Sequence, residues 1–138
     1  MKGIVLTSHG TLAQGLAHAA TFFMGDAVEQ LAYCCLKPDS APEEFGRELK
    51  EAVSRVDTGD GVVILADLLG GTPCNQAAGL LGDKVDLIAG MNFPILLELL
   101  TGRMMGDVDL TALIENGRSG ICDVKAVLNQ VACDEEEE

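Results

Sequence analysis

The chain has 138 residues, of which 48% are hydrophobic and 22% charged, so it is long and apolar enough to form one folded domain. Nine Lys plus Arg against 22 Asp plus Glu give a net charge of −13, and no basic cluster is present to release counterions from nucleic acid. Apolar runs such as 62–66 are far shorter than the roughly 20 residues that span a bilayer. These features argue against a nucleic-acid partner and a membrane span, and we expect a cytoplasmic protein.

Short apolar runs alternate with amphipathic segments along the chain. We predict strands over 3–7, 28–36, 62–67 and 85–89, where aliphatic residues follow one another without helical spacing. We predict helices over 12–23, 40–56, 72–81, 94 to about 102, and around 110–114. Ser40 and Thr72 are the expected N-caps of the second and third of these helices, and Pro94 is expected to start the fourth. Residues 123–127 are predicted as a final strand.

This alternation predicts an α/β fold, a three-layer αβα and doubly wound domain with a four-stranded parallel sheet. If the strand order is 2-1-3-4, the first and third strands are neighbours and the switch point lies between them. Ligands of such sheets bind beyond the carboxyl ends of the strands at that point. We therefore expect His9, which follows the first strand, and Asp67, which ends the third, to face each other.

We take residues 1–133 as the domain and the acidic run 134–138 as a solvated tail, because like charges repel one another. The five cysteines include no CxxC pair, and the adjacent Cys34 and Cys35 would point to opposite faces of a strand and could not share a metal. We expect the cysteines to be reduced, buried and structural.

The residues at the switch point favour phosphoryl transfer through a histidine. A neutral imidazole can attack phosphorus with one nitrogen while the other donates to a carboxylate, and His9 and Asp67 fit these two roles. The N–H groups of Gly71 and Thr72, at a helix N-terminus, would bind the phosphoryl oxygens. The candidate phosphate-binding residues are Ser8, Gly10, Thr11, Gly70, Gly71 and Thr72. We assign His18, in the middle of a predicted helix, to a surface or packing role.

Four separated stretches of the chain carry a more specific pattern. They are residues 4–10 with Ser8-His9-Gly10, residues 65–73 with Asn75, residues 89–94 with Glu98, and residues 116–121. In this order they resemble the IIA component (EIIA) of the mannose/fructose/sorbose family of the bacterial phosphoenolpyruvate-dependent sugar phosphotransferase system (PTS). Two positions depart from the family pattern, with Thr72 where many members have Ser and Leu69 where the residue is often aromatic. Neither departure conflicts with phosphotransfer.

The resemblance implies a transferase subunit in sugar transport that needs neither a cofactor nor a metal. It implies that His9 accepts a phosphoryl group on Nε2, as a tele-phosphohistidine, from the phosphocarrier HPr, with Asp67 as the orienting carboxylate. A separate EIIB component would then receive the group, while the membrane components EIIC and EIID move the sugar. The resemblance also implies a cytoplasmic homodimer in which a C-terminal strand can cross to the neighbouring subunit.

Other interpretations stay open at this point. A phosphoryl donor domain for a dihydroxyacetone kinase also uses a histidine after its first strand, and a PTS regulatory phosphoacceptor would receive phosphate without transport. A two-component receiver would explain Asp67, but it needs an acidic pair for Mg²⁺ where this chain has Ser8-His9. A flavodoxin-like module could hold a phosphate on residues 8–11, but none of the five aromatic residues lies in a loop suited to stacking a flavin.

Overall fold

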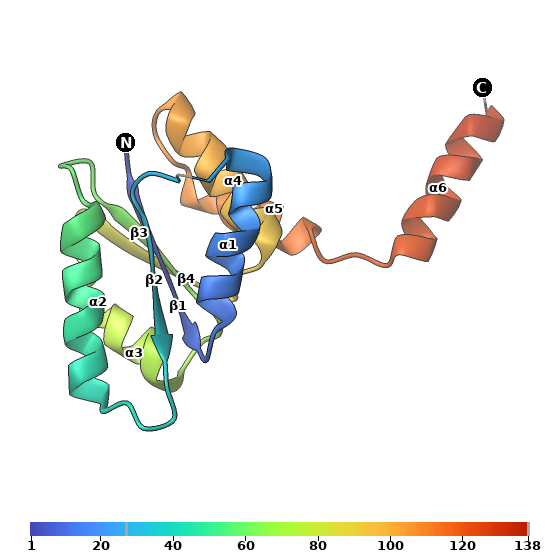
Figure 1. Ribbon diagram of the computed structural model, residues 1–138. Helices are drawn as coiled ribbons and strands as arrows, with labels where there is room; N and C mark the ends of the chain where they lie inside the picture. The colour runs from blue at the N-terminus through green and yellow to red at the C-terminus, as the bar shows by residue number, and fades with distance from the viewer. Residues whose placement is uncertain (27, 138) are drawn as a thin grey trace.

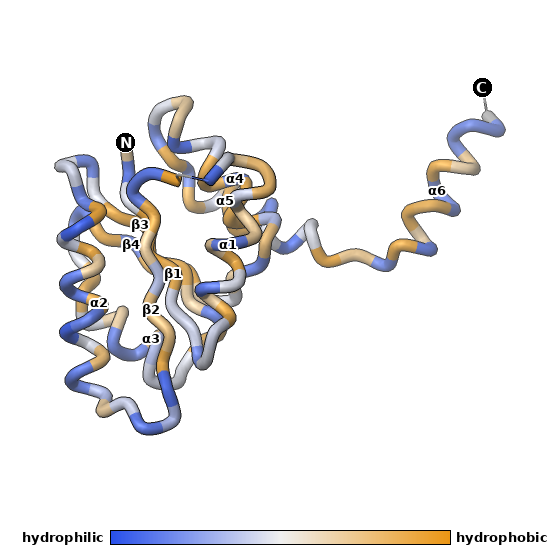
Figure 2. The backbone as a smooth tube through the Cα atoms, in the orientation of Figure 1, coloured by the Kyte–Doolittle hydropathy of each residue, from blue (hydrophilic) through white to orange (hydrophobic). Residues whose placement is uncertain are grey.

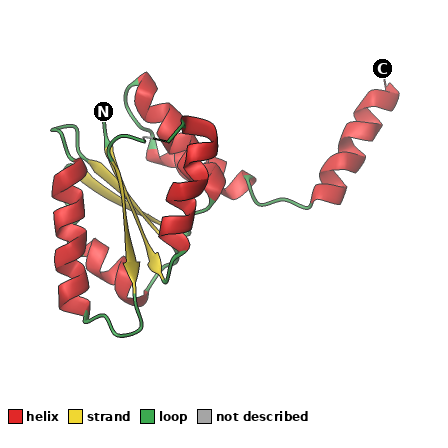
Figure 3. Cartoon of the chain, viewed as in Figure 1, coloured by secondary structure: helices red, strands yellow, loops and turns green. Residues whose placement is uncertain are grey.

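The computed structural model describes residues 1–26 and 28–137, and its sheet lies between two layers of helices (Figures 1 and 3). The elements in chain order are β1 (Gly3–His9), α1 (Leu12–Met24), β2 (Leu31–Leu36), α2 (Pro42–Val56), β3 (Val62–Ala66), α3 (Gly71–Ala78), β4 (Val85–Ala89), α4 (Phe93–Gly102), the 3₁₀ helix η1 (Arg103–Met105), α5 (Leu110–Ser119) and α6 (Val124–Glu137). The strands pair in parallel in the order β2-β1-β3-β4, which confirms the predicted doubly wound fold. Within the described ranges no helix is long and apolar enough to cross a membrane.

Both faces of the sheet are buried, because alternate residues of a strand point to different helical layers. Ile4 and Leu6 of β1 pack in a cluster with residues of α1, α4 and α5. Val5, between them in the sequence, packs on the other face with residues of α2 and α3, including Phe45. Figure 2 shows the apolar residues of the central strands inside these layers. The residues of β1 are buried up to its last one, His9, which is exposed at the carboxyl end of the sheet.

The predicted elements of the sheet and its helices are confirmed, with differences at their ends. β2 begins three residues later and α3 ends three residues earlier than predicted. The N-cap of α2 is Ala41 and not Ser40. The N-cap of α3 is Gly70 and not Thr72, because Gly70 and Gly71 take φ values of 86° and 76° that turn the chain before the helix begins.

The C-terminal segment differs most from the prediction. The predicted strand over 123–127 is wrong, because Val124–Glu137 forms α6. At the start of this helix, the Asp123 side chain accepts a hydrogen bond from the N–H of Ala126 at 3.3 Å. Figure 1 shows α6 standing apart from the sheet, and residues 124–136 are all exposed. The boundary expected between residues 133 and 134 falls inside this helix, so the part of the acidic run that the structure describes is helical.

The five free cysteines divide into two groups. Cys34 and Cys74 are buried and Cys35 is half-buried, as expected, but Cys122 and Cys133 are exposed because they flank or belong to α6. The prediction of buried cysteines is therefore wrong for these two. Burial, with a contribution from the charge of Glu48, raises the pKa of Cys34 to about 11, so its thiol stays protonated at neutral pH.

Arg103 ties together the amino ends of two neighbouring strands. Its side chain is 4% exposed, and its guanidinium donates to the carbonyl oxygens of Lys2, Gln30 and Glu29. Burial lowers the pKa of Arg103, but a guanidinium remains charged across the ordinary pH range. Three backbone acceptors therefore depend on one buried cation.

The substitution Arg103→Met should lower the free energy of unfolding by about 3 kcal/mol, because these carbonyl groups lose a charged donor inside the protein. Urea unfolding followed by circular dichroism measures the change. Arg47→Met, at an exposed position of α2, is the matched control and should stay within about 0.5 kcal/mol of wild type. Equal losses in the two variants would contradict the role of Arg103.

Candidate functional site

His9 and Asp67 lie side by side at the carboxyl ends of the two central strands. Thr7 of β1 pairs with Ala66 of β3, so the residues that follow them leave the sheet at the same level. His9 Nδ1 is 2.8 Å from Asp67 Oδ2, and the backbone N–H of His9 donates to that same oxygen at 3.0 Å. The structure thus brings together the two residues that the sequence predicts to face each other.

Asp67 sets the protonation pattern of the His9 ring. Burial would raise the pKa of Asp67, but hydrogen bonds from the backbone and ring of His9, the charge of His9 and the N–H of Leu68 lower it overall. An ionised carboxylate only accepts hydrogen bonds, so Nδ1 carries the proton of the neutral ring and Nε2 keeps a lone pair. The His9 side chain is 47% exposed and that of Asp67 only 9%, which leaves the ring accessible while the carboxylate is largely covered.

The N-terminus of α3 lies beside this lone pair. A Cβ atom added to Gly71 would come within 3.0 Å of His9 Nε2 and 2.8 Å of Cε1. The N–H groups of Gly71 and Thr72 belong to the first turn of α3, where a helix offers no internal acceptor. Together with the helix dipole, they form an environment that favours an anion next to Nε2.

Two of the candidate phosphate-binding residues have other hydrogen-bond partners. Ser8 is fully buried, and its hydroxyl donates to the carbonyl oxygen of Gly10 at 3.1 Å and accepts from the N–H of Ala13 at 2.8 Å. The N–H of Gly10 donates to the carbonyl oxygen of Leu36 at 2.8 Å. These bonds hold the turn between β1 and α1, so neither group is free to bind a phosphoryl oxygen in this conformation.

The remaining candidates lie around the histidine in the chain. Thr11 is exposed and precedes α1, and Gly70 caps α3 directly before Gly71. His18 is exposed on α1, with its ring 6.3 Å from that of Phe22, as its predicted surface role requires.

Sequence reasoning did not predict the exposure of three leucines that lie close in the chain to His9 and Asp67. Leu12 opens α1, and Leu68 and Leu69 follow Asp67; their exposed fractions are 51%, 49% and 85%. The available signal was the pair of consecutive leucines inside a glycine-rich loop, where apolar side chains have no core to enter.

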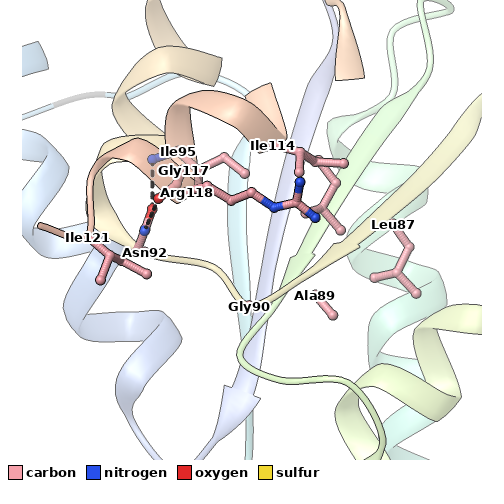
Figure 4. A pocket seen from close by; sticks show the side chains of 10 residues that line it. Leu87, Ala89, Gly90, Asn92, Ile95, Ile114, Gly117, Arg118 and Ile121 are labelled. Atoms are coloured by element: carbon pink, nitrogen blue, oxygen red, sulfur yellow. Dashed lines mark hydrogen bonds between the residues drawn. The ribbon is translucent and has the colours of Figure 1, made fainter. Parts of the chain in front are cut away.

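A separate hollow of about 350 Å³ lies between β4 and α5 (Figure 4). Its lining includes Gly90, Ile114 and Arg118, and neither His9 nor Asp67 belongs to it. Asn92 accepts a hydrogen bond from the N–H of Ile95 at 3.0 Å and donates to the carbonyl oxygen of Gly117 at 2.8 Å, which joins α4 to α5 at one side of the hollow. The hollow therefore contains none of the residues that make up the histidine site.

The chain is similar to known proteins over most of its length. Residues 3–116 match the family described as "PTS system fructose IIA component". The "PTS system mannose-specific EIIAB component" of Escherichia coli (strain K12) is 34% identical over 131 residues, covering 89% of this chain and 39% of that protein. The "PTS system fructose-specific EIIA component" of Bacillus subtilis (strain 168) is 28% identical over 105 residues, covering 75% of this chain and 71% of that protein. The crystal structure of the PTS IIA protein associated with the fucose utilization operon from Streptococcus pneumoniae superposes with a TM-score of 0.84 at 31% identity, covering 92% of this chain and 96% of that chain.

The fold and the site define a doubly wound α/β domain with a carboxylate-oriented histidine at its switch point. The chain belongs to the mannose-type EIIA family of the sugar phosphotransferase system, which places it among the phosphotransferase components of that system. It spans about 39% of the length of the E. coli EIIAB relative. Family membership favours phosphotransfer over the receiver and flavodoxin alternatives.

Proposed function

We propose that the protein is a cytoplasmic phosphoryl carrier, which accepts a phosphoryl group on His9 from phospho-HPr and passes it to an EIIB component for sugar uptake through EIIC and EIID. The observation that carries this proposal is the 2.8 Å contact between His9 Nδ1 and Asp67 Oδ2, which leaves Nε2 with a lone pair on an exposed ring. Membership of the EIIA family supports the same role.

Each transfer forms one nitrogen–phosphorus bond and breaks another. The lone pair of His9 Nε2 attacks the phosphorus of the donor's phosphohistidine, and the electron pair of the broken bond stays on the donor's ring nitrogen. Nδ1 keeps its proton throughout, and Asp67 stabilises the positive charge that the ring acquires. Transfer to EIIB follows the same course with His9 as the donor.

The phosphoryl oxygens would be bound by donors that surround Nε2. We assign this role to the N–H groups of Gly71 and Thr72 at the start of α3, together with the hydroxyls of Thr72 and Thr11 and the backbone of Gly70. Asp67 accepts from the opposite side of the ring, so its charge does not face the phosphoryl group. Ser8 and Gly10 act indirectly in this scheme, because they hold the turn that carries His9.

Intact-protein mass spectrometry after incubation with phosphoenolpyruvate, enzyme I and HPr tests the proposal. We expect one added phosphoryl group that is lost in acid, as a phosphohistidine is. An unmodified protein, or an acid-stable adduct, would contradict it.

The substitution Gly71→Ala should slow phosphorylation of His9 by about 100-fold, because misplacing reacting groups by about 1 Å costs roughly that factor. The added Cβ would lie 3.0 Å from Nε2, and the φ of 76° is strained for alanine. The rate is read from the mass adduct over time. Gly102→Ala is the control, because Gly102 has a helical φ of −63° and open space around its added Cβ. Equal rates in the two variants would contradict a close approach of Gly71 to the reacting nitrogen.

We also propose that the protein is a homodimer. On α6, Val124, Val127, Leu128 and Val131 are exposed and form one stripe, with the i, i+3, i+4, i+7 spacing of a helix face. An isolated helix of this length is marginal in water, so a second subunit that covers the stripe would stabilise it. Light scattering at micromolar concentration should give twice the 14.5 kDa mass of the chain. A monomer mass would contradict the dimer.

A further inference from the structure

We propose that a hollow between α1 and the edge strand β2 binds an aliphatic ammonium ion. The ammonium group contacts Asp26, and the alkyl chain lies on the apolar floor of the hollow. The hollow has a volume of about 320 Å³, and neither His9 nor Asp67 lines it. The inference is therefore independent of the phosphoryl transfer proposed for His9.

One wall of the hollow is formed by the polar side chains of α1. This helix has no charged residue, and its three polar residues, Gln14, His18 and Thr21, all line the hollow. Their spacing of i, i+4 and i+7 places them on one side of the helix, with Ala17 among them. The polar groups of an otherwise apolar helix are thus gathered at one place.

The opposite wall comes from β2 and the loop before it. Ala32 packs in the core cluster on the α2 side of the sheet, so the next residue, Tyr33, points to the α1 side. Tyr33 is 46% exposed there, because β2 is the last strand of the sheet. Ala17, Val28 and Leu31 are partly buried against the other core cluster and form the apolar floor between the two walls.

Several polar groups around the hollow have unused hydrogen-bonding capacity. The side chains of Gln14 and Asp26 and the hydroxyl of Tyr33 make no hydrogen bond or ion pair with other residues that the structure describes. The Thr21 hydroxyl donates to the carbonyl oxygen of His18 at 2.7 Å, which leaves its lone pairs for another donor. The His18 ring packs edge-on against an aromatic neighbour, so we assign it to the boundary of the hollow.

The charges around the hollow favour a cation. Asp26 supplies a carboxylate, and of the described residues that line the hollow none is Lys or Arg. The net charge of −13 repels anions and attracts cations at longer range. An ammonium group gains Asp26 and the side-chain oxygens of Gln14 and Thr21 as acceptors, and the face of the Tyr33 ring also attracts a cation. Burying the alkyl chain on the apolar floor removes it from water.

Tyrosine fluorescence reports on this hollow alone. Tyr33 is the single tyrosine of the chain, which has no tryptophan, so the emission comes from one wall of the hollow. Butylammonium chloride is the probe, because it joins an ammonium group to an alkyl chain. 1-Butanol is the uncharged molecule of the same length, glucose represents a neutral polyol, and sodium chloride at equal concentration controls for ionic strength.

We expect butylammonium to change the Tyr33 emission saturably, with a Kd of about 1 to 10 mM, as is usual for so small a ligand. 1-Butanol should bind at least about 10-fold more weakly, because it lacks the charge. Asp26→Asn should weaken binding of butylammonium by about 10-fold or more, because a charged hydrogen bond is lost. Asp39→Asn is the matched control, because Asp39 is an exposed carboxylate that does not line the hollow, and it should bind like wild type.

The same chemical group exists as a free amine and as the side chain of lysine. Nα-acetyllysine amide carries the alkylammonium group on a peptide unit, and its titration distinguishes the two sources. Tighter binding than that of butylammonium would assign the site to a lysine side chain of a partner protein. Equal or weaker binding would assign it to a free aliphatic amine.

Other outcomes would overturn the proposal. An emission change that does not saturate, or that sodium chloride reproduces, would show that no site exists. Equal binding of 1-butanol would reduce the hollow to an apolar contact, and equal losses in Asp26→Asn and Asp39→Asn would attribute the attraction to net charge. Saturable binding of glucose without that of butylammonium would replace the cation by a polyol. Because the fluorescence signal does not require phosphoryl transfer, each of these failures leaves the function proposed for His9 unaffected.

Discussion

Replacing His9 by alanine should abolish phosphoryl uptake completely. His9 is the histidine that the fold places beside a carboxylate, with Asp67 Oδ2 at 2.8 Å from its Nδ1. The other histidine, His18, lies on the exposed surface of α1 against the ring of Phe22 and has no comparable activation. Loss of the nucleophile removes the reaction itself, so the expected change is from one phosphoryl group to none.

Intact-protein mass spectrometry with phosphoenolpyruvate, enzyme I and HPr measures this loss. His18→Ala is the control and should gain the same acid-labile group as wild type. Because the His9 side chain is 47% exposed, its removal should leave the circular dichroism spectrum unchanged, which excludes unfolding as the cause. An adduct on the His9→Ala protein would place the phosphoryl group elsewhere and contradict the assignment.

The meeting of His9 and Asp67 could be predicted from the position of each residue at the end of a buried apolar run and from the expected strand order 2-1-3-4, which makes the two strands neighbours. Each residue follows a buried apolar run at once, and in a parallel sheet the ends of neighbouring strands coincide. The strand register then fixes the relative position of the two residues, because Thr7 pairs with Ala66 and the residues after them leave the sheet at the same level. The approach of Gly71 follows in the same way, because α3 begins within a few residues of β3.

Features that depend on distant backbone could not be predicted. Nothing around Gly10 indicates that its N–H is taken by the carbonyl oxygen of Leu36 from the neighbouring strand. Arg103 likewise binds carbonyl groups of residues 2 and 30, which are 101 and 73 positions away in the chain. Such contacts arise only from tertiary packing, so residue type and spacing carry no sign of them.

The strand predicted over 123–127 was wrong for a different reason. The short apolar pattern around Val124, Val127 and Leu128 fits one face of a helix, but its β-branched residues also suit a strand. Asp123 favours the helix over the strand, because its side chain accepts a hydrogen bond from the first turn of α6 and so stabilises the start of this helix.

Replacing Asp67 by alanine should leave the protein folded but slow phosphoryl transfer by about 100-fold or more, because the orienting partner of a catalytic histidine contributes at least that much. Without the carboxylate, the proton of the neutral imidazole is shared between Nδ1 and Nε2, and the charge on the phosphorylated ring loses its counterion. The defect should appear mainly in kcat, measured by single-turnover transfer from phospho-HPr. Asp107→Ala, at an exposed position, is the control. Equal transfer rates in Asp67→Ala and wild type would exclude the orienting role.

The effect of Asp67→Ala on the free energy of unfolding should also depend on pH, and this dependence separates a charge effect of Asp67 from a packing effect. The pKa of Asp67 is lowered from its ordinary value of 3.8, so its ionised form stabilises the fold above that value and loses its effect as the pH falls through the lowered pKa. The stabilisation that wild type has over Asp67→Ala should therefore be present above about pH 4 and shrink as the pH falls through the lowered pKa of Asp67. Urea titrations at several pH values would measure it, and a difference that persisted unchanged in acid would mean that Asp67 stabilises the protein by packing rather than by its charge next to His9.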